Sequence, residues 1–450
     1  PAISCLTDCS LLIGSRRSGA PPPDGPLTTP RMTREITPVP VCYRAAVPAC
    51  FLAKSYACYG VSAFKAESRL PMTTAETRPD TDQQLFRIAI NASHAKTGGG
   101  VTYLRQMLPL LAAEPDVSLH LILHKEQLAL FDPVPDGIDV LVCDYTPRFF
   151  PTLVWEQFRL PGIARRLSAD VLFSPANFGP LFARNHILLL RNATSVIRLA
   201  RRLKPLAYWF MLSAATMASL LTARRAIAVS NYAAGLLTFG MKSVRNRKVS
   251  VVYHGTAPVV APREGNEVPG TNLLAVSDIY IQKNYHTLLR AFAILRDSRK
   301  DLTLTIVGRE IDSHYGDALR DLMRDLGLGD AVRFVGHVDT AELDTLYREC
   351  QLFIFPSAVE TFGNPLLEAM AHGAPIATSN AAAMPEVIGD AGLTFDPDNV
   401  QEMAARITTL LVDPALRAEL GRRAARRARS FTWEETARRT LGVLREAAGR

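Results

Sequence analysis

Two carboxylates with seven residues between them stand in the stretch that runs from Phe355 to Pro375. Glu360 lies in the loop after an apolar run, and Glu368 lies inside the following segment of helical pattern. Each alone is equally consistent with a solvated loop carboxylate or with compensation of a helix dipole. Together they predict a polar ligand that is held at both sides of one helix start.

The helix start between these carboxylates has the composition of an anion site. We expect Asn364 to be the N-cap and Pro365 the first helical residue. Free backbone N–H groups and the helix dipole favour negative charge at such an end. Gly363 would let the ligand approach the backbone closely.

A lysine and a glycine loop could meet the charge of the same anion. Lys283 is one of nine lysines among 51 basic residues, which makes a merely solvated loop lysine the less attractive reading. Gly98, Gly99 and Gly100 stand at a predicted strand-to-helix turn, where their backbone amides could contact a diphosphate or an acceptor. The loop has neither the spacing of a dinucleotide fingerprint nor that of a P-loop, and glycines that serve only a tight turn remain the alternative.

The elements that must position these residues form two alternating strand–helix series. Their apolar runs do not alternate cleanly, which is typical of parallel strands buried on both faces. The first series has predicted strands at Phe86–Asn91, Ser118–His124, Asp139–Cys143, Val171–Ser174, Ile187–Leu190 and Ala226–Val229. The second has them at Leu273–Val276, Leu302–Val307, Val332–Val335, Leu352–Phe355, Ile376–Thr378 and Leu393–Phe395. The fold class is therefore α/β, with two doubly wound Rossmann-like domains that face each other across a cleft.

Composition suggests where the domains begin and end. Residues 1–84 are rich in proline and lack periodicity, so we expect a disordered or wrongly assigned extension. A targeting segment is the rival reading, but no apolar stretch follows a basic one there. Residues 85–258 would form the acceptor-side domain and residues 259–428 the donor-side domain, with a hinge rich in Pro, Gly and Glu between them. Residues 429–450 would form a final helix.

Four shorter motifs accompany the paired carboxylates, in a fixed order along the chain: Val229-Ser-Asn231, Val252-Tyr-His-Gly255, Ser277 to Asn284, and Phe334-Val-Gly-His337. Phe431-Thr-Trp433 then precedes the last helical segment. This order resembles the retaining nucleotide-sugar glycosyltransferases of GT-B type, family 4, over about residues 87–447. The resemblance implies that the final helix crosses back onto the first domain.

The resemblance also implies roles for individual residues. Lys283 would neutralise the donor diphosphate, Glu368 would accept hydrogen bonds from the ribose hydroxyls, and Glu360 would contact the transferred sugar. The glycine loop would lie over the donor phosphates. The donor-binding set would be Gly98, Gly99, Gly100, Lys283, Phe362, Gly363, Asn364, Pro365 and Glu368. No cofactor and no metal ion is expected, and Asp396-Pro-Asp398 reads as a helix-entry turn.

Three positions depart from the family pattern. Ser277 stands where an Arg often precedes the phosphate lysine, so Arg309 is a candidate further partner of the phosphates. Asn177 stands where many members have a His near the reacting carbon, and it could donate a hydrogen bond there. Arg191 and the following Asn stand where relatives often show His-Asp. These departures indicate a divergent subgroup.

The resemblance implies a retaining hexosyltransferase, with mannose or glucose as the transferred sugar. It would use a nucleoside-diphosphate sugar and a hydroxyl acceptor in a cell-surface polysaccharide or a lipid-linked glycan. A nucleotide-sugar epimerase of the same architecture is one alternative, for which His94, His254 and His337 could supply acid–base groups. A catalytically inactive sugar-nucleotide-binding assembly protein is another.

The net charge and the positions of the cysteines bear on two further questions: whether the protein binds nucleic acid, and in which compartment it lies. The net charge is +8, and residues 401–450 carry eleven Arg against six acids, without the interleaved aromatics of a nucleic-acid-binding arm. We therefore expect no nucleic-acid partner. Cys143 and Cys350 lie in apolar runs and are typical of buried thiols in a reducing compartment, which favours the cytoplasm.

The uncharged run Leu206–Ala223 raises the question of a membrane span. Its hydroxyl residues and the strand that follows it favour a core helix instead. Basic residues just before it could touch anionic headgroups at the inner face of the plasma membrane, or form a solvated basic turn. They are Arg198, Arg201, Arg202 and Lys204.

Overall fold

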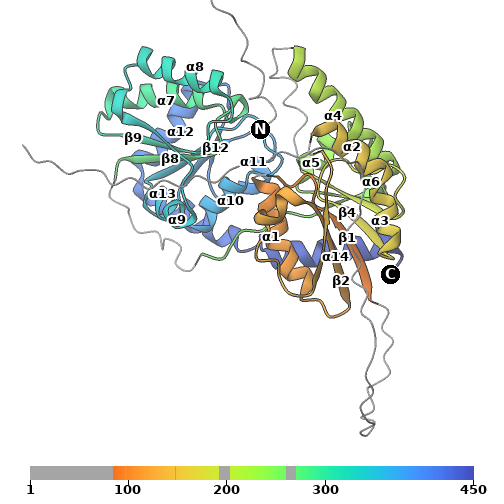
Figure 1. Cartoon of the computed structure of the whole chain (residues 1–450). Helices are drawn as coiled ribbons and strands as arrows, with labels where there is room; N and C mark the ends of the chain where they lie inside the picture. The colour runs from red at the N-terminus through yellow and green to blue at the C-terminus, as the bar shows by residue number, and fades with distance from the viewer. Residues whose placement is uncertain (1–84, 97, 147, 192–202, 260–269) are drawn as a thin grey trace, which may run out of the picture. The chain divides into compact units, whose positions relative to one another are not determined.

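The computed structural model describes residues 85–450 except 97, 147, 192–202 and 260–269 (Figure 1). The amino-terminal extension, Thr97, the basic residues Arg198, Arg201 and Arg202, and most of the hinge therefore lie outside the described residues, as does the side chain of Lys204.

The first sheet is parallel throughout, in the strand order β3-β2-β1-β4-β5-β6-β7. Strand β1 lies at the topological switch point, where ligands bind in doubly wound sheets. The strands are β1 Phe86–Asn91, β2 Val117–His124, β3 Ile138–Cys143, β4 Val171–Ser174, β5 His186–Leu190, β6 Arg225–Ala228 and β7 Val249–Val251.

The second sheet repeats this design in the order β10-β9-β8-β11-β12-β13, again all parallel. Its switch point lies between β8 and β11, so the loops that follow these strands are the natural ligand loops. The strands are β8 Asn272–Val276, β9 Thr303–Val307, β10 Val332–Gly336, β11 Leu352–Phe355, β12 Ile376–Ser379 and β13 Leu393–Phe395.

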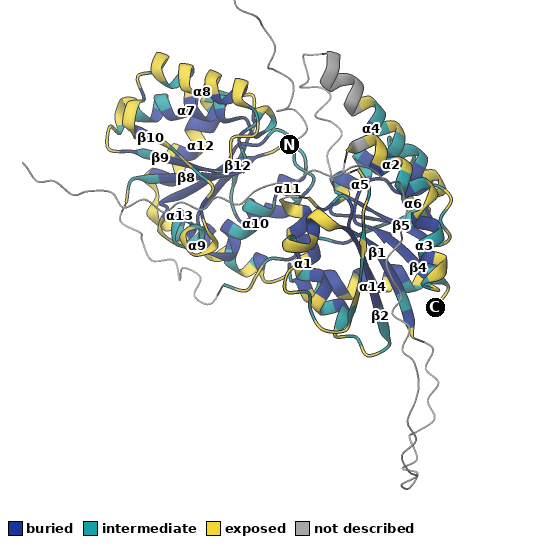
Figure 2. Ribbon diagram, viewed as in Figure 1, coloured by how far each residue is buried: buried dark blue, intermediate teal, exposed yellow. Residues whose placement is uncertain are grey.

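Helices cover both sheets because their apolar faces must be buried against the strands. Figure 2 shows central strands such as β1 and β8 in the buried colour and the outer face of α8 in the exposed one. In the first domain the helices are α1 Gly99–Ala112, α2 Phe149–Phe158, α3 Leu160–Arg166, α4 Leu203–Thr222, α5 Asn231–Leu237 and α6 Lys242–Lys248. In the second they are α7 Tyr285–Ser298, α8 Ser313–Asp325, α9 Thr340–Glu349, α10 Asn364–Ala371, α11 Met384–Ile388, α12 Val400–Val412 and α13 Pro414–Ala428.

The strands predicted from the sequence are confirmed to within one or two residues. The sequence of residues 152–167 has one continuous helical pattern, but the structure has two helices, α2 and α3, with a break at Arg159. Pro161 explains the break, because proline has no N–H to donate and its ring clashes with the preceding turn. The short edge strand β7 was not predicted.

The uncharged run forms α4, which packs on the first sheet with Leu212, Thr216, Ser219 and Leu220 buried. These residues recur at helical spacing, as expected of a core helix. Within the described residues, no helix combines the length and the apolar character that a membrane crossing requires.

The last helix, α14 Trp433–Ala448, packs against α1 and against β4, β5 and β6 of the first sheet. Arg445 pairs with Asp116 at 2.7 Å, and Thr436 Oγ1 donates a hydrogen bond to the Tyr253 carbonyl. A Cβ on Gly255 would overlap the backbone between Thr432 and Trp433. The end of the chain therefore completes the core of the first domain.

Candidate functional site

Lys283 and Glu360 form an ion pair within the second domain. Lys283 ends the short 3₁₀ turn Ile281–Lys283 that follows β8, and Glu360 lies in the loop that follows β11. The next residue, Asn284, adopts a left-handed conformation and donates from its side-chain amide to the carbonyls of Pro356 and Pro397. These bonds tie the lysine turn to the loops after β11 and β13.

The environment of Lys283 keeps the ammonium charged although it is buried. Desolvation lowers its pKa, but the Glu360 carboxylate, with smaller contributions from Tyr280 and Tyr285, raises the pKa above the ordinary lysine value. The Nζ atom lies 5.3 Å from the centre of the Tyr280 ring and 6.0 Å from that of Phe355. The pair as a whole is electrically neutral.

The helix start lies one residue earlier than the sequence predicted. Gly363, not Asn364, is the N-cap of α10; it has φ +91°, while Asn364 and Pro365 are the first two helical residues. A left-handed cap favours glycine, and a Cβ at this position would lie 3.2 Å from Cε1 of Phe355. The Asn364 side chain is therefore not a cap, and its Oδ1 lies 3.1 Å from Nδ1 of His254.

Glu368 makes a separate contact. Its Oε2 accepts a 3.0 Å hydrogen bond from the Tyr347 hydroxyl. Desolvation raises the pKa of Glu368, the Tyr347 hydrogen bond lowers it in part, and Asp344 adds to the rise. No described hydrogen bond joins Glu368 to the Lys283–Glu360 pair, although Tyr285 lies within electrostatic range of both Lys283 and Tyr347.

The glycine loop of the first domain reaches the start of α10. Gly98 caps α1 with φ +58°, as expected of a tight strand-to-helix turn. A Cβ on Gly99 would lie 3.8 Å from Nδ2 of Asn364 and 3.8 Å from Nη1 of Arg191. Gly98–Gly100, Asn364 and Arg191 therefore meet at one place.

Two hydroxyl groups tie the same loop of the second domain to the first. Thr361 Oγ1 donates to the carbonyl of Arg191, and Ser230 Oγ donates to the carbonyl of Thr361. Asn177 is buried and accepts a 2.8 Å hydrogen bond at Oδ1 from the backbone N–H of Arg191. The structure thus places Asn177 as a support of the chain that follows β5.

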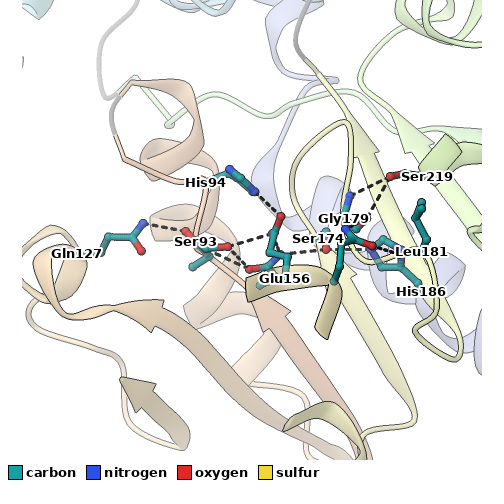
Figure 3. A network of polar contacts seen from close by, with 12 residues as sticks. Ser93, His94, Gln127, Glu156, Ser174, Gly179, Leu181, His186 and Ser219 are labelled. Atoms are coloured by element: carbon teal, nitrogen blue, oxygen red, sulfur yellow. Dashed lines mark hydrogen bonds and ion pairs between the residues drawn. The ribbon is translucent and has the colours of Figure 1, made fainter. Parts of the chain in front are cut away.

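A buried polar network around Glu156 was not predicted (Figure 3). Glu156 on α2 has no exposed surface, and its Oε1 accepts hydrogen bonds from Asn91 Nδ2 and Ser93 Oγ. His94 Nε2 lies 2.8 Å from Glu156 Oε2. An imidazole held by a buried carboxylate is a possible proton acceptor at the end of β1. The signal in the sequence is that Glu156 is the single charged residue of its helix.

The neighbouring Gln157 fixes the loop that carries Asn177. Its Nε2 donates to the Gly179 carbonyl at 3.2 Å, and its Oε1 accepts from the N–H of Leu181 at 2.9 Å. Ser219 on α4 holds Gly179 from the other side (Figure 3). The Glu156-Gln157 dipeptide therefore supports both β1 and the loop after β4.

The structure gives the remaining candidate residues, Arg309, His337 and Asp396, no place in this site. Arg309 pairs with Asp278, with 3.4 Å between Nη2 and Oδ2, so its charge already has a partner. His337 is exposed. Asp396 accepts from the N–H of Asp398 at 2.9 Å just before α12, which confirms the predicted helix-entry turn. In the part of the chain that the structure describes, no three His, Cys, Asp or Glu side chains are grouped as a metal site would require.

Comparison with known proteins gives a family match within the second domain. Residues 263–427 match the family described as glycosyl transferases group 1. Residues 263–427 are less than half of the chain, and this matched segment is named the group 1 domain. Lys283, Glu360, Gly363 and Glu368 all lie within this group 1 domain.

Two curated relatives illustrate the match. The O-antigen chain mannosyltransferase B of Escherichia coli is 33% identical over 165 residues, which cover 36% of this chain and 43% of the relative. A D-inositol 3-phosphate glycosyltransferase of Pseudarthrobacter chlorophenolicus is 34% identical over 195 residues, which cover 42% of this chain and 46% of the relative. The match thus spans less than half of the length of each relative.

Solved structures cover the group 1 domain and the first domain together. The sucrose-phosphate synthase of Thermosynechococcus elongatus superposes with a TM-score of 0.64 at 20% identity, over 80% of this chain and 98% of that one. Anabaena Alr3699/HepE in complex with UDP-glucose gives a TM-score of 0.63 at 17% identity, over 80% of this chain and 99% of that one. These likenesses confirm the predicted GT-B fold of two Rossmann-like domains.

Proposed function

We propose that this protein is a retaining glycosyltransferase that moves a hexose, such as mannose or glucose, from a nucleoside-diphosphate sugar to a hydroxyl acceptor. The acceptor would be a cell-surface polysaccharide or a lipid-linked glycan. The observation that carries the proposal is the Lys283–Glu360 pair, whose carboxylate lies in the loop that leads into α10, within the domain that matches group 1 glycosyl transferases. The mannosyltransferases among the relatives favour a hexose donor.

The roles of the residues follow from the charge that leaves with the nucleoside diphosphate. Lys283 and the N–H groups at the start of α10 stabilise the developing charge on the leaving phosphate. The donor's phosphates take over the ammonium from Glu360, which frees the carboxylate to accept hydrogen bonds from the transferred sugar. Glu368 accepts from the ribose hydroxyls, in the place of its bond from Tyr347.

The proposed chemistry needs no metal ion, because Lys283 and backbone amides cover the diphosphate charge. Retention would come from attack of the acceptor on the face from which the nucleotide departs. The acceptor hydroxyl gives its proton to the leaving phosphate oxygen as the new glycosidic bond forms. Closure of the two domains would exclude water and limit hydrolysis of the donor.

Exposed aromatic residues on the first domain support an acceptor at a membrane surface. Val154 and Phe158 share one face of α2 and are exposed, Phe158 by 77%, and Phe182 in the adjoining loop is 82% exposed. Large apolar side chains exposed close together mark a surface that contacts a membrane or another protein. We infer that this surface makes peripheral contact with the cytoplasmic face of the membrane.

A vesicle sedimentation assay tests this contact. The double variant Phe158→Ser, Phe182→Ser should sediment severalfold less with phosphatidylglycerol vesicles than the wild type does. Unchanged sedimentation of the double variant would exclude this surface.

The decisive experiment mixes the full chain with UDP-, GDP-, ADP- and dTDP-hexoses and a lipid-linked glycan extract, then measures nucleotide release. Release that depends on acceptor, survives EDTA and yields a product with the donor's anomeric configuration supports the proposal. Lys283→Ala should lower the rate about 100-fold or more. Arg105→Gln, an exposed change on α1, serves as the matched control and should leave the rate unchanged.

The same assay separates the alternatives. An epimerase would return an isomerised sugar nucleotide without acceptor, with the His94–Glu156 pair as the available acid–base group. His254 suits this chemistry less well, because burial lowers its pKa to about 4. An assembly protein without catalytic activity would bind the nucleotide and release nothing.

A further inference from the structure

Arg191 brings an unmatched positive charge to the site. It follows β5 in the first domain, and its guanidinium lies against the glycine loop. A Cβ built on Gly100 would lie 3.0 Å from the Cζ atom of Arg191 and 3.2 Å from its Nη1. Gly100 thus leaves space that the guanidinium occupies.

This guanidinium lacks a counter-ion among the described residues, since no carboxylate there pairs with it within 4.0 Å. Its Nε atom is buried and makes no hydrogen bond. Burial lowers the pKa of Arg191 to about 10, and Tyr103 raises it in part, so the group remains charged at neutral pH. An unpaired cation at a half-buried residue is costly unless a ligand supplies the missing charge.

The charge balance around the start of α10 points to an anion. The Lys283–Glu360 pair contributes no net charge. His254 beside Asn364 is neutral near pH 7, because burial holds its pKa at about 4. Arg309 is occupied by Asp278. Arg191 therefore adds a positive charge at this place that none of these groups offsets.

The backbone of Arg191 is fixed from both domains. Its N–H donates to Asn177 Oδ1, and its carbonyl accepts from Thr361 Oγ1, the residue next to Glu360. The fork of N–H donors on a guanidinium suits a phosphate, and a fixed backbone reduces the entropy lost on binding.

We propose that Arg191 is a phosphate-binding residue of the donor site, which it reaches from the first domain, and that it takes the place of the cation that Ser277 does not provide. The assignment rests on the proposed function. It requires Gly100, whose missing side chain leaves room for the guanidinium, and it makes Asn177 a positioning residue. The phosphates would thus be held by Lys283 and the start of α10 on one side and by Arg191 on the other.

The test first measures binding of UDP, GDP and ADP to the full chain by titration calorimetry. The nucleoside diphosphate that binds most tightly, and the corresponding nucleoside, are then titrated into each variant. Arg191→Gln should weaken the nucleoside diphosphate about 10- to 100-fold and leave the nucleoside within twofold, because only the phosphates lose a partner. Arg191→Lys should recover part of the loss. Arg105→Gln, which removes an exposed charge on α1, should change neither affinity.

A second variant tests the geometry without removing the arginine. Gly100→Ala places a methyl group where the guanidinium lies, and its helical backbone tolerates alanine, so it should weaken the diphosphate as Arg191→Gln does. Melting temperatures within a few degrees of wild type would show that both variants fold.

The outcomes distinguish a failure of the Arg191 assignment from a failure of the proposed function. Diphosphate affinity that is unchanged in Arg191→Gln but lost in Lys283→Ala would overturn the assignment and leave the proposed function intact. An equal loss for nucleoside and diphosphate would also overturn it, because a merely structural arginine acts on both. A wild-type chain that binds no nucleoside diphosphate would remove the proposed function itself.

Discussion

At the scale of single residues, the site is defined by which charges have partners. Lys283 and Glu360 neutralise each other, with 8% and 15% of their side chains exposed. Such a pair is costly to break, because either partner left alone is a poorly solvated ion. The Lys283–Glu360 pair differs in this respect from the many ion pairs at the surface of α8, α13 and α14. Those exposed pairs contribute little to the free energy of unfolding.

Glu360→Gln should therefore destabilise the fold by on the order of 3 kcal/mol, since Lys283 would remain buried without a counter-charge. A nucleoside diphosphate would replace that charge and should stabilise this variant more than the wild type. Urea unfolding with and without UDP or GDP measures both effects. Asp317→Asn, which breaks an exposed pair with Arg320, is the matched control and should change stability by less than about 1 kcal/mol. Equal losses in the two variants would contradict the argument.

Two buried histidines make the fold sensitive to acid. Burial lowers the pKa of His186 and of His254 to about 4, although Glu156 opposes the shift at His186 and Asn364 opposes it at His254. The unfolded chain takes up these protons near pH 6.5, before the folded chain does, so stability falls as the pH drops from 6.5 towards 4.

The expected loss is about 2 kcal/mol per histidine between pH 7.5 and pH 5.0. Urea unfolding at both pH values checks it. His186→Gln removes one titrating group and should flatten the pH dependence by that amount, even though its stability at pH 7.5 is lower. A variant with the slope of the wild type would show that other groups dominate.

Sequence alone could single out Lys283, Glu360 and Glu368 as candidates, because spacing and rarity along the chain are what mark them. It could not single out Glu156, whose importance comes from complete burial against β1, nor Arg191, whose counter-ion is missing only once the fold brings its neighbours together. The sequence could not predict the hydrogen-bond partner of Glu368 either, since Tyr347 lies on another helix.

At the scale of elements, α10 shows how one backbone angle sets the site. The left-handed Gly363 turns the chain from the Glu360 loop into the helix, and its carbonyl accepts hydrogen bonds from the N–H groups of Leu366 and Leu367. A side chain at this residue would be strained and would also press on Phe355.

Gly363→Ala should cost about 1 to 2 kcal/mol and lower the transfer rate as well, because the helix start would shift. Gly162→Ala on α3 is the control, since nothing lies within 4 Å of its Cβ position and alanine favours a helix. Thermal unfolding and nucleotide release measured on the same samples test the coupling. A Gly363→Ala variant with wild-type stability and rate would show that the cap is not needed.

The strands were predictable because parallel strands buried on both faces give short, uninterrupted apolar runs. Helix ends were less so. The break between α2 and α3 depends on one proline, and the start of α10 depends on a φ angle that the sequence suggests only through the presence of glycine. The three-residue strand β7 is too short for its pattern to stand out.

At the scale of the whole molecule, the end of the chain belongs to the first domain. Along the sequence α14 follows the group 1 domain, yet it contributes Leu441, Val443, Leu444 and Ala447 to the core beneath the first sheet. The position of these residues in the sequence gave no sign of this, and only the resemblance to known glycosyltransferases predicted it.

Leu444→Ala should destabilise the protein by about 2 to 5 kcal/mol, because the side chain is fully buried and its removal leaves a cavity. Val412→Ala, at a side chain that is 70% exposed near the end of α12, is the control and should have an effect below about 0.5 kcal/mol. Urea unfolding of both variants provides the comparison. Similar values for the two would mean that α14 does not stabilise the first domain.

The position of α14 also bears on biosynthesis. The strands of the first sheet leave the ribosome by Val251, but the helix that covers them is made only after the entire group 1 domain has been translated. At ordinary rates of elongation that interval is roughly ten seconds or more. During it the nascent first domain has an uncovered apolar face, which is a natural binding surface for chaperones, while the domain translated later can fold at once.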